Sequence, residues 1–502
     1  MSGLILAHDL GTTGDKATLV DETGEPVASI TAAYPTDFGP GGLAEQDPLA
    51  WWGAVCTASA ALLDRVPGSA ADVAGVSFSG QMMGAVFLDS AGEPLRPAVI
   101  WADTRAVAQA AHLERELGLE RFYRITGHRP NATYSLPKVM RVRDDEPEVF
   151  AQVRHIVLAK DYIAFRLTGE LASDPSDASS TNAFDQVAGC WSDDILAAAA
   201  IPSGLWPQVV PSTTVIGAVT AQAARATGIP QGTPVVMGGG DGPMAAVGAG
   251  IVIPESGAYA YLGSSSWVSV ATKEPLYDDE FRTMTFTHVV PGAFVPTATM
   301  QAGGASLQWI VDVLEPERGA ASDRYAELLA DAGRVQASAD GLFFLPHLLG
   351  ERSPYWNPRA RAVFAGLARH HGREHLARAV LEGVAFNLLT SLQAFRTNGV
   401  SVARIDAIGG VAASSVALAV LSDVWGVPVS RLELADEATS VGAAVTGGVG
   451  VGLFDGFGLA AARVRRREEQ APDAANHARY VAAHELFLDA YRRLEPWFDR
   501  LP

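Results

Sequence analysis

Cysteine is almost absent from this chain of 502 residues, which contains only Cys56 and Cys190. Two cysteines disfavour a disulfide framework or a cysteine-based zinc site, and such scarcity is typical of proteins from reducing compartments. The first residues also lack the basic segment and the long apolar segment of a secretory leader. We therefore expect a cytoplasmic protein without structural disulfides.

Long hydrophobic runs are missing as well. The most apolar stretch, residues 405–424, is interrupted by Gly409-Gly410, Ser414-Ser415 and Asp423. A membrane-spanning helix needs about 20 consecutive apolar residues. The stretch therefore predicts a loop followed by a buried helix, and we expect no membrane partner.

Positive charge is scarce, because 37 Lys and Arg residues stand against 56 Asp and Glu residues and give a formal net charge of −19. This excess argues against broad nucleic-acid binding and against an anionic membrane surface, since both attract basic proteins. A single bound nucleotide is not excluded, because it needs only local hydrogen-bond donors. The hydrophobic content of 48% and the length are those of a globular protein with more than one domain.

What the chain does contain is a pair of similar turns, Asp9–Lys16 (D-L-G-T-T-G-D-K) and Tyr261–Ser266 (Y-L-G-S-S-S). Each follows an apolar stretch and precedes a β-prone one, which predicts strand, tight turn and strand twice over. Glycine backbone and small hydroxyls offer donors to phosphate oxygens with no bulky side chain in the way. Because the turns lie about half the chain apart, we expect two similar domains that hold one polyphosphate between them.

Strands and helices alternate along both halves, which predicts an α/β fold with a domain boundary near residue 250. The first domain, residues 1–250, is predicted to begin with a three-stranded meander and to contain a buried strand at 73–78. The second domain, residues 251–502, is predicted to contain a hairpin at 258–270 and a long helix at 374–395. A polar amphipathic helix follows residue 473.

Asp241 stands within the run Gly238-Gly239-Gly240-Asp241-Gly242, at a predicted strand end and helix start. The N-terminus of a helix stabilises a carboxylate, although an ordinary N-cap aspartate also explains the position. A cap does not require the surrounding glycines, so we favour a functional carboxylate. The turn Gly409–Ser414 (G-G-V-A-A-S) also follows a strand and opens a helix, where an adenine and its ribose can lie against backbone.

Two other motifs have plainer interpretations. His371–His375 (H-G-R-E-H) matches the H-x-x-E-H pattern of inverse zincins. That pattern needs a continuous helix, whereas Gly372 stands where this helix is predicted to begin, so we do not favour a metalloprotease. His8, next to Asp9, is interpreted as a buried strand histidine with a hydrogen-bond partner, not as a metal ligand.

Together these motifs resemble the FGGY carbohydrate kinases of the sugar-kinase/actin/Hsp70 superfamily, and within that family the xylulokinases most of all. The likeness runs from about Leu4 to Gly450. Besides the two turns and G-G-G-D-G, it rests on G-Q-M-M-G at 80–84, L-R-P-A-V-I-W-A-D-T-R at 95–105, L-A-K-D-Y at 158–162, S-D-P-S-D-A-S at 173–179, P-H-L-L-G-E-R-S-P at 346–354 and D-E-A-T-S-V-G-A-A at 436–444. The run from His375 to Glu382 satisfies the family's C-terminal motif.

The resemblance implies two ribonuclease-H-like (actin-like ATPase) domains flanking a central cleft, and a homodimer. It implies ATP-dependent phosphorylation of a primary hydroxyl of a small sugar, D-xylulose or a related ketose. Asp241 is the implied base and also contacts the sugar, and Asp9 is implied to hold Mg²⁺ through water. The implied ATP contacts are Gly11, Thr12, Thr13, Lys16, Gly263, Ser264, Ser265, Gly304, Gln308, Gly410 and Ser414. The other implied sugar contacts are Gln81, Met82, Met83, Trp101 and Asp103.

Four places depart from the family pattern. Met83 stands where the xylulokinases usually have His, and Gly242 where they usually have Asn. The adenosine turn reads Gly410-Val411-Ala412 in place of G-G-A, and Arg141 replaces an expected Trp. Since Met83 and Gly242 remove two polar partners near the sugar, we expect the preference among acceptors to shift.

Three alternatives remain at this point. The first is an FGGY kinase of another polyol, ketose or sugar acid. The second is a catalytically silent protein of the same fold that binds sugar and nucleotide, which the presence of both Asp9 and Asp241 disfavours. The third is a chaperone-like ATPase of the same superfamily, which needs a peptide-binding domain that about 50 residues after Gly452 cannot supply.

Overall fold

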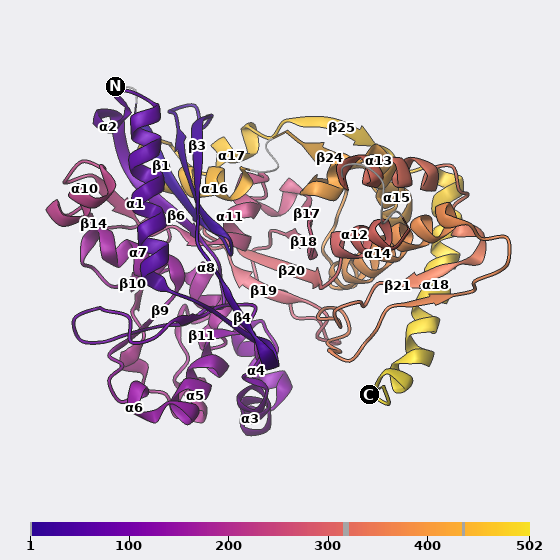
Figure 1. The fold of residues 1–502 in the computed structure, drawn as a ribbon, viewed down its shortest axis with the longest axis horizontal. Helices are drawn as coiled ribbons and strands as arrows, with labels where there is room; N and C mark the ends of the chain where they lie inside the picture. Colours follow the sequence, from indigo (N-terminus) through magenta and orange to yellow (C-terminus); the bar gives the residue numbers. More distant parts are fainter. Residues whose placement is uncertain (1–2, 315–320, 434–436, 502) are drawn as a thin grey trace.

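Two seven-stranded mixed sheets, one from each half of the chain, form the framework of the protein (Figure 1). The computed structural model describes residues 3–314, 321–433 and 437–501. Asp436, the first residue of the motif at 436–444, lies outside the described residues. In Figure 1 the first half occupies the left side and most of the second half the right side, with β17 to β20 between them.

The first sheet has the strand order β14-β15-β6-β1-β2-β3, with β16 beside β6. The predicted meander is confirmed: β1 (Leu4–Leu10), β2 (Gly14–Val20) and β3 (Pro26–Ala33) pair antiparallel. The predicted buried strand is also confirmed as β6 (Val73–Gly80), which runs parallel to β1. The remaining strands are β14 (Val215–Ala218), β15 (Pro234–Val236) and β16 (Gly239–Gly240). Apolar side chains of α1 (Pro48–Arg65), including Trp51 and Leu62, pack with the sheet in one core.

A lobe of short elements between β6 and β14 extends from the carboxyl end of this sheet. Its helices are α3 (Val107–Leu117), α4 (Leu119–Thr126), α5 (Ser135–Asp145), α6 (Pro147–Phe150), α8 (Pro175–Ala178), η2 (Ser179–Thr181) and α9 (Asp193–Ala199). Two further helices, α7 (Ala159–Thr168) and α10 (Ala221–Thr227), pack beside α1, and α10 lies between β14 and β15 in the sequence. Its short strands are β7 (Val86–Leu88), β8 (Ala98–Val99), β9 (His155–Val157), β10 (Ala172–Ser173), β11 (Phe184–Asp185), β12 (Cys190–Trp191) and β13 (Gln208–Val209). Strands β4 (Asp37–Gly39) and β5 (Leu43–Gln46) join β8 in a small separate sheet. Both cysteines, Cys56 and Cys190, are free thiols.

The second sheet repeats the theme with the order β19-β20-β18-β17-β23-β24-β25. Its strands are β17 (Ala258–Leu262), β18 (Ser266–Val270), β19 (Met284–Thr287), β20 (Phe294–Met300), β23 (Ile405–Ile408), β24 (Val429–Leu432) and β25 (Arg466–Gln470). Around it lie α12 (Gly304–Leu314), α13 (Ala321–Ala332), α14 (Arg373–Thr397), α15 (Ser415–Trp425) and α18 (Ala474–Phe498), with β21 (Phe343–Leu345) and β22 (Val363–Ala365) as a separate pair. The predicted hairpin, long helix and final helix are therefore all present.

Two small-residue helices join the halves. α16 (Ala438–Gly450) belongs to the second half of the sequence, yet it packs against β6 and β1 of the first sheet and against α11 (Asp241–Gly248). The approach is close: a Cβ at Gly442 would lie 2.0 Å from the carbonyl oxygen of Met244, and one at Gly248 would lie 1.9 Å from that of Ala438. Only glycine fits at these two positions, which explains the small residues of both helices. A boundary at residue 250 stays a prediction, and it leaves α16 on the far side of the cut from the sheet that it covers.

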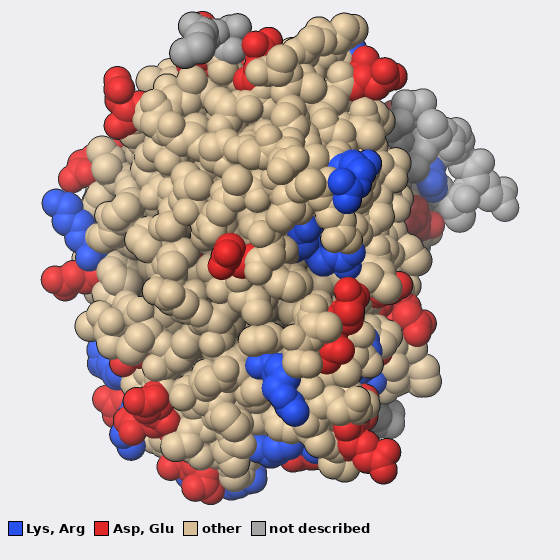
Figure 2. All heavy atoms as spheres, turned by 90° about the vertical axis from the view of Figure 1, so that its left-hand side faces the viewer, with Lys and Arg blue, Asp and Glu red and all other residues tan. Residues whose placement is uncertain are grey.

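The charge on the surface and the character of the helices can be compared with the expectation that the protein binds neither nucleic acid nor a membrane. Figure 2 shows the face of the first half, where Lys and Arg side chains stand singly or in small groups beside Asp and Glu on an otherwise uncharged surface. Among the helices that the structure describes, none combines the length and the apolar character needed to cross a membrane.

Candidate active site

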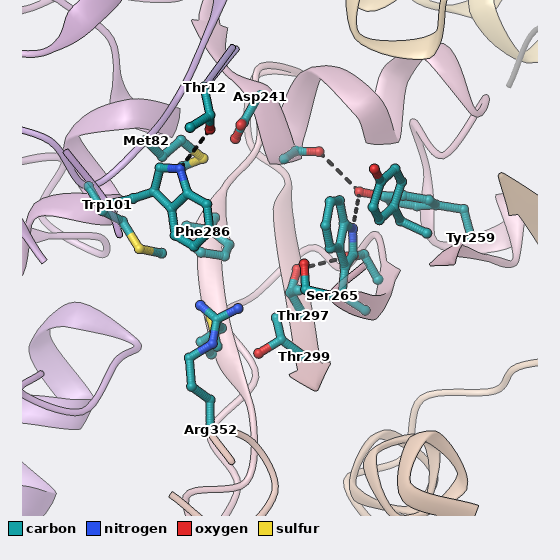
Figure 3. A pocket seen from close by; sticks show the side chains of 16 residues that line it. Thr12, Met82, Trp101, Asp241, Tyr259, Ser265, Phe286, Thr297, Thr299 and Arg352 are labelled. Carbon is teal, nitrogen blue, oxygen red and sulfur yellow. Dashed lines mark hydrogen bonds between the residues drawn. The ribbon is translucent and has the colours of Figure 1, made fainter. Parts of the chain in front are cut away.

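A cavity of about 280 Å³ lies where the two sheets face each other, and side chains from both halves line it (Figure 3). From the first half come Thr12, Met82, Met83, Trp101, Asp241 and Gly242. From the second half come Tyr259, Tyr261, Ser265, Trp267, Ser269, Met284, Phe286, Thr297, Thr299 and Arg352. Figure 3 shows Thr12 and Asp241 at one end, while Arg352 extends toward them from the other. Mostly aromatic and apolar walls with a few polar groups are typical of a small-molecule site.

Asp241 is the first residue of α11 and follows the two-residue strand β16, so a rigid strand end and a helix start hold it together. Burial raises the pKa of its carboxyl to about 7, and the negative charge of Asp9 adds to this increase. The backbone amides at the start of the helix act in the opposite direction. A carboxylate with a pKa near neutrality is suited to accept a proton from a substrate hydroxyl.

Asp9 lies near the end of β1, opposite Lys16 of β2. Its Oδ2 accepts a hydrogen bond of 2.5 Å from Thr439 of α16, while its Oδ1 is buried without a hydrogen-bond partner among the described residues. Burial raises the pKa of this carboxyl, and the hydroxyls of Thr439 and Ser79 and the positive charge of Lys16 oppose the increase. One carboxylate oxygen is therefore available to a cation or to its bound water.

These surroundings fit Mg²⁺ held through water. The described part of the chain contains no group of three or more His, Cys, Asp or Glu side chains that could hold a metal by themselves. Mg²⁺ does not need such a group, because it usually keeps several waters and binds one or two carboxylates together with substrate phosphates. Asp9, with its unpartnered oxygen, would be the carboxylate in such an arrangement.

The first turn is held rigidly beside Asp9. Its backbone closes through a hydrogen bond of 3.0 Å from the amide of Gly11 to the carbonyl of Gly14. Thr12 turns its hydroxyl into the cavity and accepts a hydrogen bond of 2.9 Å from the indole nitrogen of Trp101. Thr13 is exposed at the tip of the turn. The turn therefore presents backbone and hydroxyl groups next to a carboxylate and a lysine.

A second, larger groove of about 1120 Å³ lies in the second half. The structure brings six of the expected ATP contacts together in its lining: Gly263, Ser264, Gly304, Gln308, Gly410 and Ser414. The amide of Gly304 donates to the carbonyl of Gly263 at 2.7 Å, so the start of α12 lies directly on the second turn. Tyr261 lines both this groove and the smaller cavity, and Ser265 lines the cavity. The second turn is therefore the wall that the two spaces share.

Two expected sugar contacts, Gln81 and Asp103, are not among the residues that line the cavity. Gln81 is buried and donates from its amide to the side-chain oxygen of Gln46 at 2.8 Å. Asp103 is buried, accepts a hydrogen bond of 3.0 Å from the amide of Ala44, and pairs with Arg105 at 2.6 Å. Both side chains have partners within the protein, although Gln81 Oε1 has none among the described residues, and their contact with a sugar stays a prediction.

Other lining residues were missed by sequence reasoning. Thr297 and Thr299 are two residues apart in β20, so their side chains lie on the same face of the strand. A search for strand periodicity could have found this pattern. Arg352 lies in a loop after β21, inside the motif at 346–354, to which the sequence assigns no sugar contact. Its Nε is buried without a hydrogen-bond partner among the described residues, and burial lowers the pKa of the guanidinium. A partly buried guanidinium in such surroundings is a strong donor for a ligand oxygen.

The two plainer interpretations of the sequence agree with the structure. α14 begins at Arg373, so His371 lies before the helix and the H-x-x-E-H pattern is not displayed on a continuous helix. His8 is buried in β1, where its ring nitrogens lie 2.9 Å from Asp15 and 3.2 Å from the hydroxyl of Ser59.

Comparison with known proteins identifies the arrangement. Residues 4–248 match the N-terminal domain of the FGGY family of carbohydrate kinases, and residues 258–451 match its C-terminal domain. The xylulose kinase of Escherichia coli (strain K12) is 33% identical over 98% of this chain and 99% of its own length. The xylulose kinase structure from Rhodospirillum rubrum is 32% identical, with a TM-score of 0.91 over 99% of this chain and 100% of its own.

A gluconate kinase structure from Lactobacillus acidophilus is also similar, with a TM-score of 0.93 and 25% identity over the full length of both chains. The predicted two-domain fold of the actin-like ATPase type is confirmed by these neighbours. The sequence, the fold and the paired turns agree: the chain belongs to the FGGY family of carbohydrate kinases.

Proposed function

We propose that this sugar kinase transfers the γ-phosphoryl group of ATP to a primary hydroxyl of D-xylulose or a related ketose, with Mg²⁺ as the metal. The observation that carries the proposal is the position of Asp241. A carboxylate with a pKa of about 7 stands at one end of an aromatic cavity, beside the turn that follows Asp9. The similarity to xylulose kinases over almost the whole chain supports the choice of a ketose.

Asp241 acts as the general base in this mechanism. The hydroxyl oxygen of the acceptor attacks the γ-phosphorus, its proton passes to an Oδ of Asp241, and the bond to the β,γ-bridging oxygen breaks to release ADP. Phosphoryl transfer depends mainly on positioning and on charge stabilisation. Mg²⁺ near Asp9 supplies charge neutralisation at the β- and γ-phosphates.

The nucleotide lies along the larger groove in this proposal. Gly410 and Ser414 border the end that receives the adenosine, and Gly304 and Gln308 lie beside the second turn. The phosphates pass between the two turns in this proposal, since Thr12 of the first turn and Ser265 of the second line the same cavity. The proposed contacts are Gly11, Thr12, Thr13 and Lys16 on one side and Gly263, Ser264 and Ser265 on the other. This assignment explains why the two turns consist of small residues, since close approach of phosphate requires a backbone without bulky side chains.

The acceptor occupies the smaller cavity. Trp101 offers a flat face to the C–H side of a sugar, and Met82 and Met83 close the adjacent wall. Arg352 lies at the end opposite Asp241, where its guanidinium can donate to the sugar oxygens farthest from the reacting hydroxyl. Met83 and Gly242 offer no side-chain hydrogen bond at the positions where xylulokinases usually have His and Asn. The main polar partners of the sugar are then Arg352, Thr297 and Thr299 from the second half.

The test is ADP release with a panel of ketopentoses, pentitols, tetritols and sugar acids. We expect D-xylulose or a related ketose to give the highest kcat/KM, and Asp241→Asn to abolish sugar-dependent release while ATP binding persists. Preference for a sugar acid such as gluconate would overturn the ketose assignment. Binding of sugar and ATP with no release of ADP for any acceptor would show a catalytically silent binding protein. Retained turnover in Asp241→Asn would exclude Asp241 as the general base.

We also propose a cytoplasmic homodimer with a domain boundary near residue 250. The two free thiols and the family relationship support the compartment and the oligomer. Light scattering during size-exclusion chromatography tests the dimer, and limited proteolysis near residue 250 tests the boundary.

A further inference from the structure

The segment Asp174–Thr181 contacts three separate walls of the acceptor cavity, although no residue of it lines that cavity. It comprises α8, η2 and the N-cap residue Asp174, and we refer to it as the serine block. Its contacts run through the hydroxyls of Ser176, Ser179 and Ser180, whose side chains are fully buried. The reaction described above uses none of them.

Ser176 holds the segment that carries the base. Its hydroxyl accepts a hydrogen bond of 3.0 Å from the amide of Gly240, the residue immediately before Asp241. The same hydroxyl donates to Asp174 Oδ2 at 2.5 Å. Packing is tight here, since a Cβ at Gly239 would lie 2.5 Å from the Ser176 oxygen. The position of Asp241 therefore depends on a hydroxyl that is itself fixed by a carboxylate.

Ser180 holds the loop that contacts the sugar. Its hydroxyl accepts a hydrogen bond of 3.1 Å from the amide of Met83 and donates to the carbonyl of Asp177 at 2.7 Å. Met83 has a φ of 64°, a left-handed conformation that non-glycine residues rarely adopt. Lys138 donates to the carbonyl of Met83 at 2.7 Å, so both backbone groups of this strained residue are held.

Ser179 repeats the pattern toward the second half of the chain. Its hydroxyl accepts a hydrogen bond of 3.1 Å from the amide of Thr287 and donates to the carbonyl of Ser176 at 2.7 Å. Thr287 ends β19, the strand from which Met284 and Phe286 line the cavity. Each of the three hydroxyls thus donates within the block and accepts an amide from a different wall.

A buried ion cluster anchors the block. The ammonium of Lys160 lies 2.6 Å from Asp161, 3.0 Å from Asp174 and 3.6 Å from Asp177, and all four side chains are buried. Burial by itself lowers the pKa of a lysine, but the three carboxylates outweigh it and raise the pKa of Lys160 above its ordinary value. The cation therefore stays charged, and the carboxylate that fixes Ser176 keeps its partner.

We propose that Ser176 and Ser180 are positioning residues for phosphoryl transfer: through them the serine block sets the separation between the base Asp241 and the sugar-contact loop at Met83. The inference rests on the proposed function in that it takes Asp241 as the base and the cavity as the acceptor site. Displacement of a reacting group by about 1 Å can cost a hundredfold in rate. Two hydrogen bonds from one rigid block are a direct means to prevent such displacement.

The kinetic test compares Ser176→Ala with Ser180→Ala. Ser176→Ala should lower kcat by about tenfold to a hundredfold with KM values for sugar and ATP within about twofold of wild type, because only the base moves. Ser180→Ala should raise the KM for the sugar by about tenfold with a smaller loss of kcat, because the sugar loop moves. Equal effects of the two variants on kcat and KM would overturn the proposal.

Hydrogen exchange provides a readout that does not depend on turnover. Ser176→Ala should accelerate exchange in the peptide around Gly240 and not in that around Met83, and Ser180→Ala should do the opposite, because each removes one acceptor of a buried amide. Uniform acceleration in both peptides would show loss of general stability and would contradict the proposal. If wild type phosphorylates no acceptor, the proposed function fails, and this exchange pattern still decides the positioning role.

Ser422→Ala is the matched control. Ser422 is buried in α15 on the far side of the second sheet, and its hydroxyl oxygen lies 2.9 and 2.8 Å from the carbonyl oxygens of Val427 and Gln470, which share its one hydrogen. It should lower thermal stability as much as the two block variants and leave kcat and both KM values unchanged. A comparable loss of kcat in Ser422→Ala would attribute the block phenotypes to destabilisation alone.

Discussion

The two turns that first distinguish this sequence adopt the same backbone arrangement but carry different chemistry. Each closes an antiparallel hairpin, β1–β2 or β17–β18, whose first strand runs parallel to a neighbour, β6 or β23. Leu10-Gly11 and Leu262-Gly263 stand at matching points. The residue before that pair is Asp9 in the first hairpin and Tyr261 in the second.

This one difference separates the roles of the halves. Asp9 faces Lys16 across its hairpin and keeps a carboxylate oxygen unpartnered among the described residues. Tyr261 instead stacks on Trp267, with ring centroids 4.1 Å apart and an interplanar angle of 19°. A repeated hairpin thus presents a carboxylate beside a lysine on one side and an aromatic pair on the other, and the proposed function assigns the charged side to the phosphates and the metal. The two hairpins share a backbone arrangement and differ in their side chains.

The largest effect should come from removing the charge of the first hairpin. Asp9→Asn should lower kcat by about a hundredfold to a thousandfold, because one preorganised electrostatic contact is commonly worth that much. It should also raise the Mg²⁺ concentration that gives half-maximal rate. Steady-state kinetics over a Mg²⁺ titration measure both effects.

Tyr261→Phe, at the matching point of the second hairpin, is the comparison for Asp9→Asn. The ring that stacks on Trp267 is kept, so kcat should change by less than about threefold. Equal losses in the two variants would show that the hairpins do not divide their roles as the side chains indicate.

The next effect concerns Arg352, which faces the base from the second half. Arg352→Met should raise the KM of the acceptor by about tenfold to a hundredfold, the worth of a hydrogen bond to a charged group. The same change should leave the melting temperature unchanged or raise it, because it removes a buried guanidinium nitrogen that has no partner among the described residues. Acceptor titrations and thermal melts measure the two results.

The exposed Arg361 serves as the control for Arg352. Arg361→Met should change neither the KM of the acceptor nor the melting temperature by a measurable amount, since among the described residues its guanidinium donates to the backbone carbonyls of Pro358 and Ala360 alone. An acceptor KM in Arg352→Met that matches wild type would remove Arg352 from the acceptor site.

How far the sequence predicts the site follows from where its signals lie. Asp9, Asp241 and the second turn stand at strand ends with glycine beside them. Such a pattern lies within a few consecutive residues and can be recognised from the sequence alone. Arg352 belongs to the motif at 346–354, but that motif does not reveal that the tertiary fold brings the side chain opposite Asp241. Asp103 shows the reverse situation: its motif places it at the expected sugar site, whereas the structure pairs it with Arg105, and its contact with a sugar stays a prediction.

The fold was more predictable than the site for a physical reason. Each strand and each helix has its own apolar pattern in the local sequence. The order of these elements, and with it the two sheets, can be predicted from those local patterns. The crossing of α16 onto the first sheet did not follow, because its small-residue face fits the glycine-containing α11 only once the two halves have met. In the sequence, long-range packing of this kind is visible only as a high content of small residues in the two helices.

A smaller effect is expected where the second turn meets α12. A Cβ at Gly304 would lie 2.6 Å from the carbonyl oxygen of Gly263, so Gly304→Ala must push α12 away from the turn. The KM for ATP should rise by about tenfold, while the KM for the acceptor stays within about twofold, because the larger groove alone is distorted. Isothermal titration with ADP checks the same change without turnover, and an unaltered ADP affinity would contradict the placement of the nucleotide.

The smallest effect near neutral pH should be the titration of the base itself. Burial and the charge of Asp9 raise the pKa of Asp241 to about 7, so in the free enzyme about half of this carboxyl is protonated at pH 7. A protonated carboxyl cannot accept the acceptor's proton. The value of kcat/KM should therefore be near its plateau at pH 8, about twofold lower at pH 7 and about tenfold lower at pH 6.

Asp9→Asn ties this titration back to the contrast between the hairpins. Removing the charge of Asp9 removes one of the two causes that raise the pKa of Asp241. The acid limb of the residual activity should accordingly shift to lower pH, whereas Tyr261→Phe, which changes no charge at the site, should leave it in place. An acid limb that moves equally in both variants, or in neither, would mean that the limb reports a group other than Asp241.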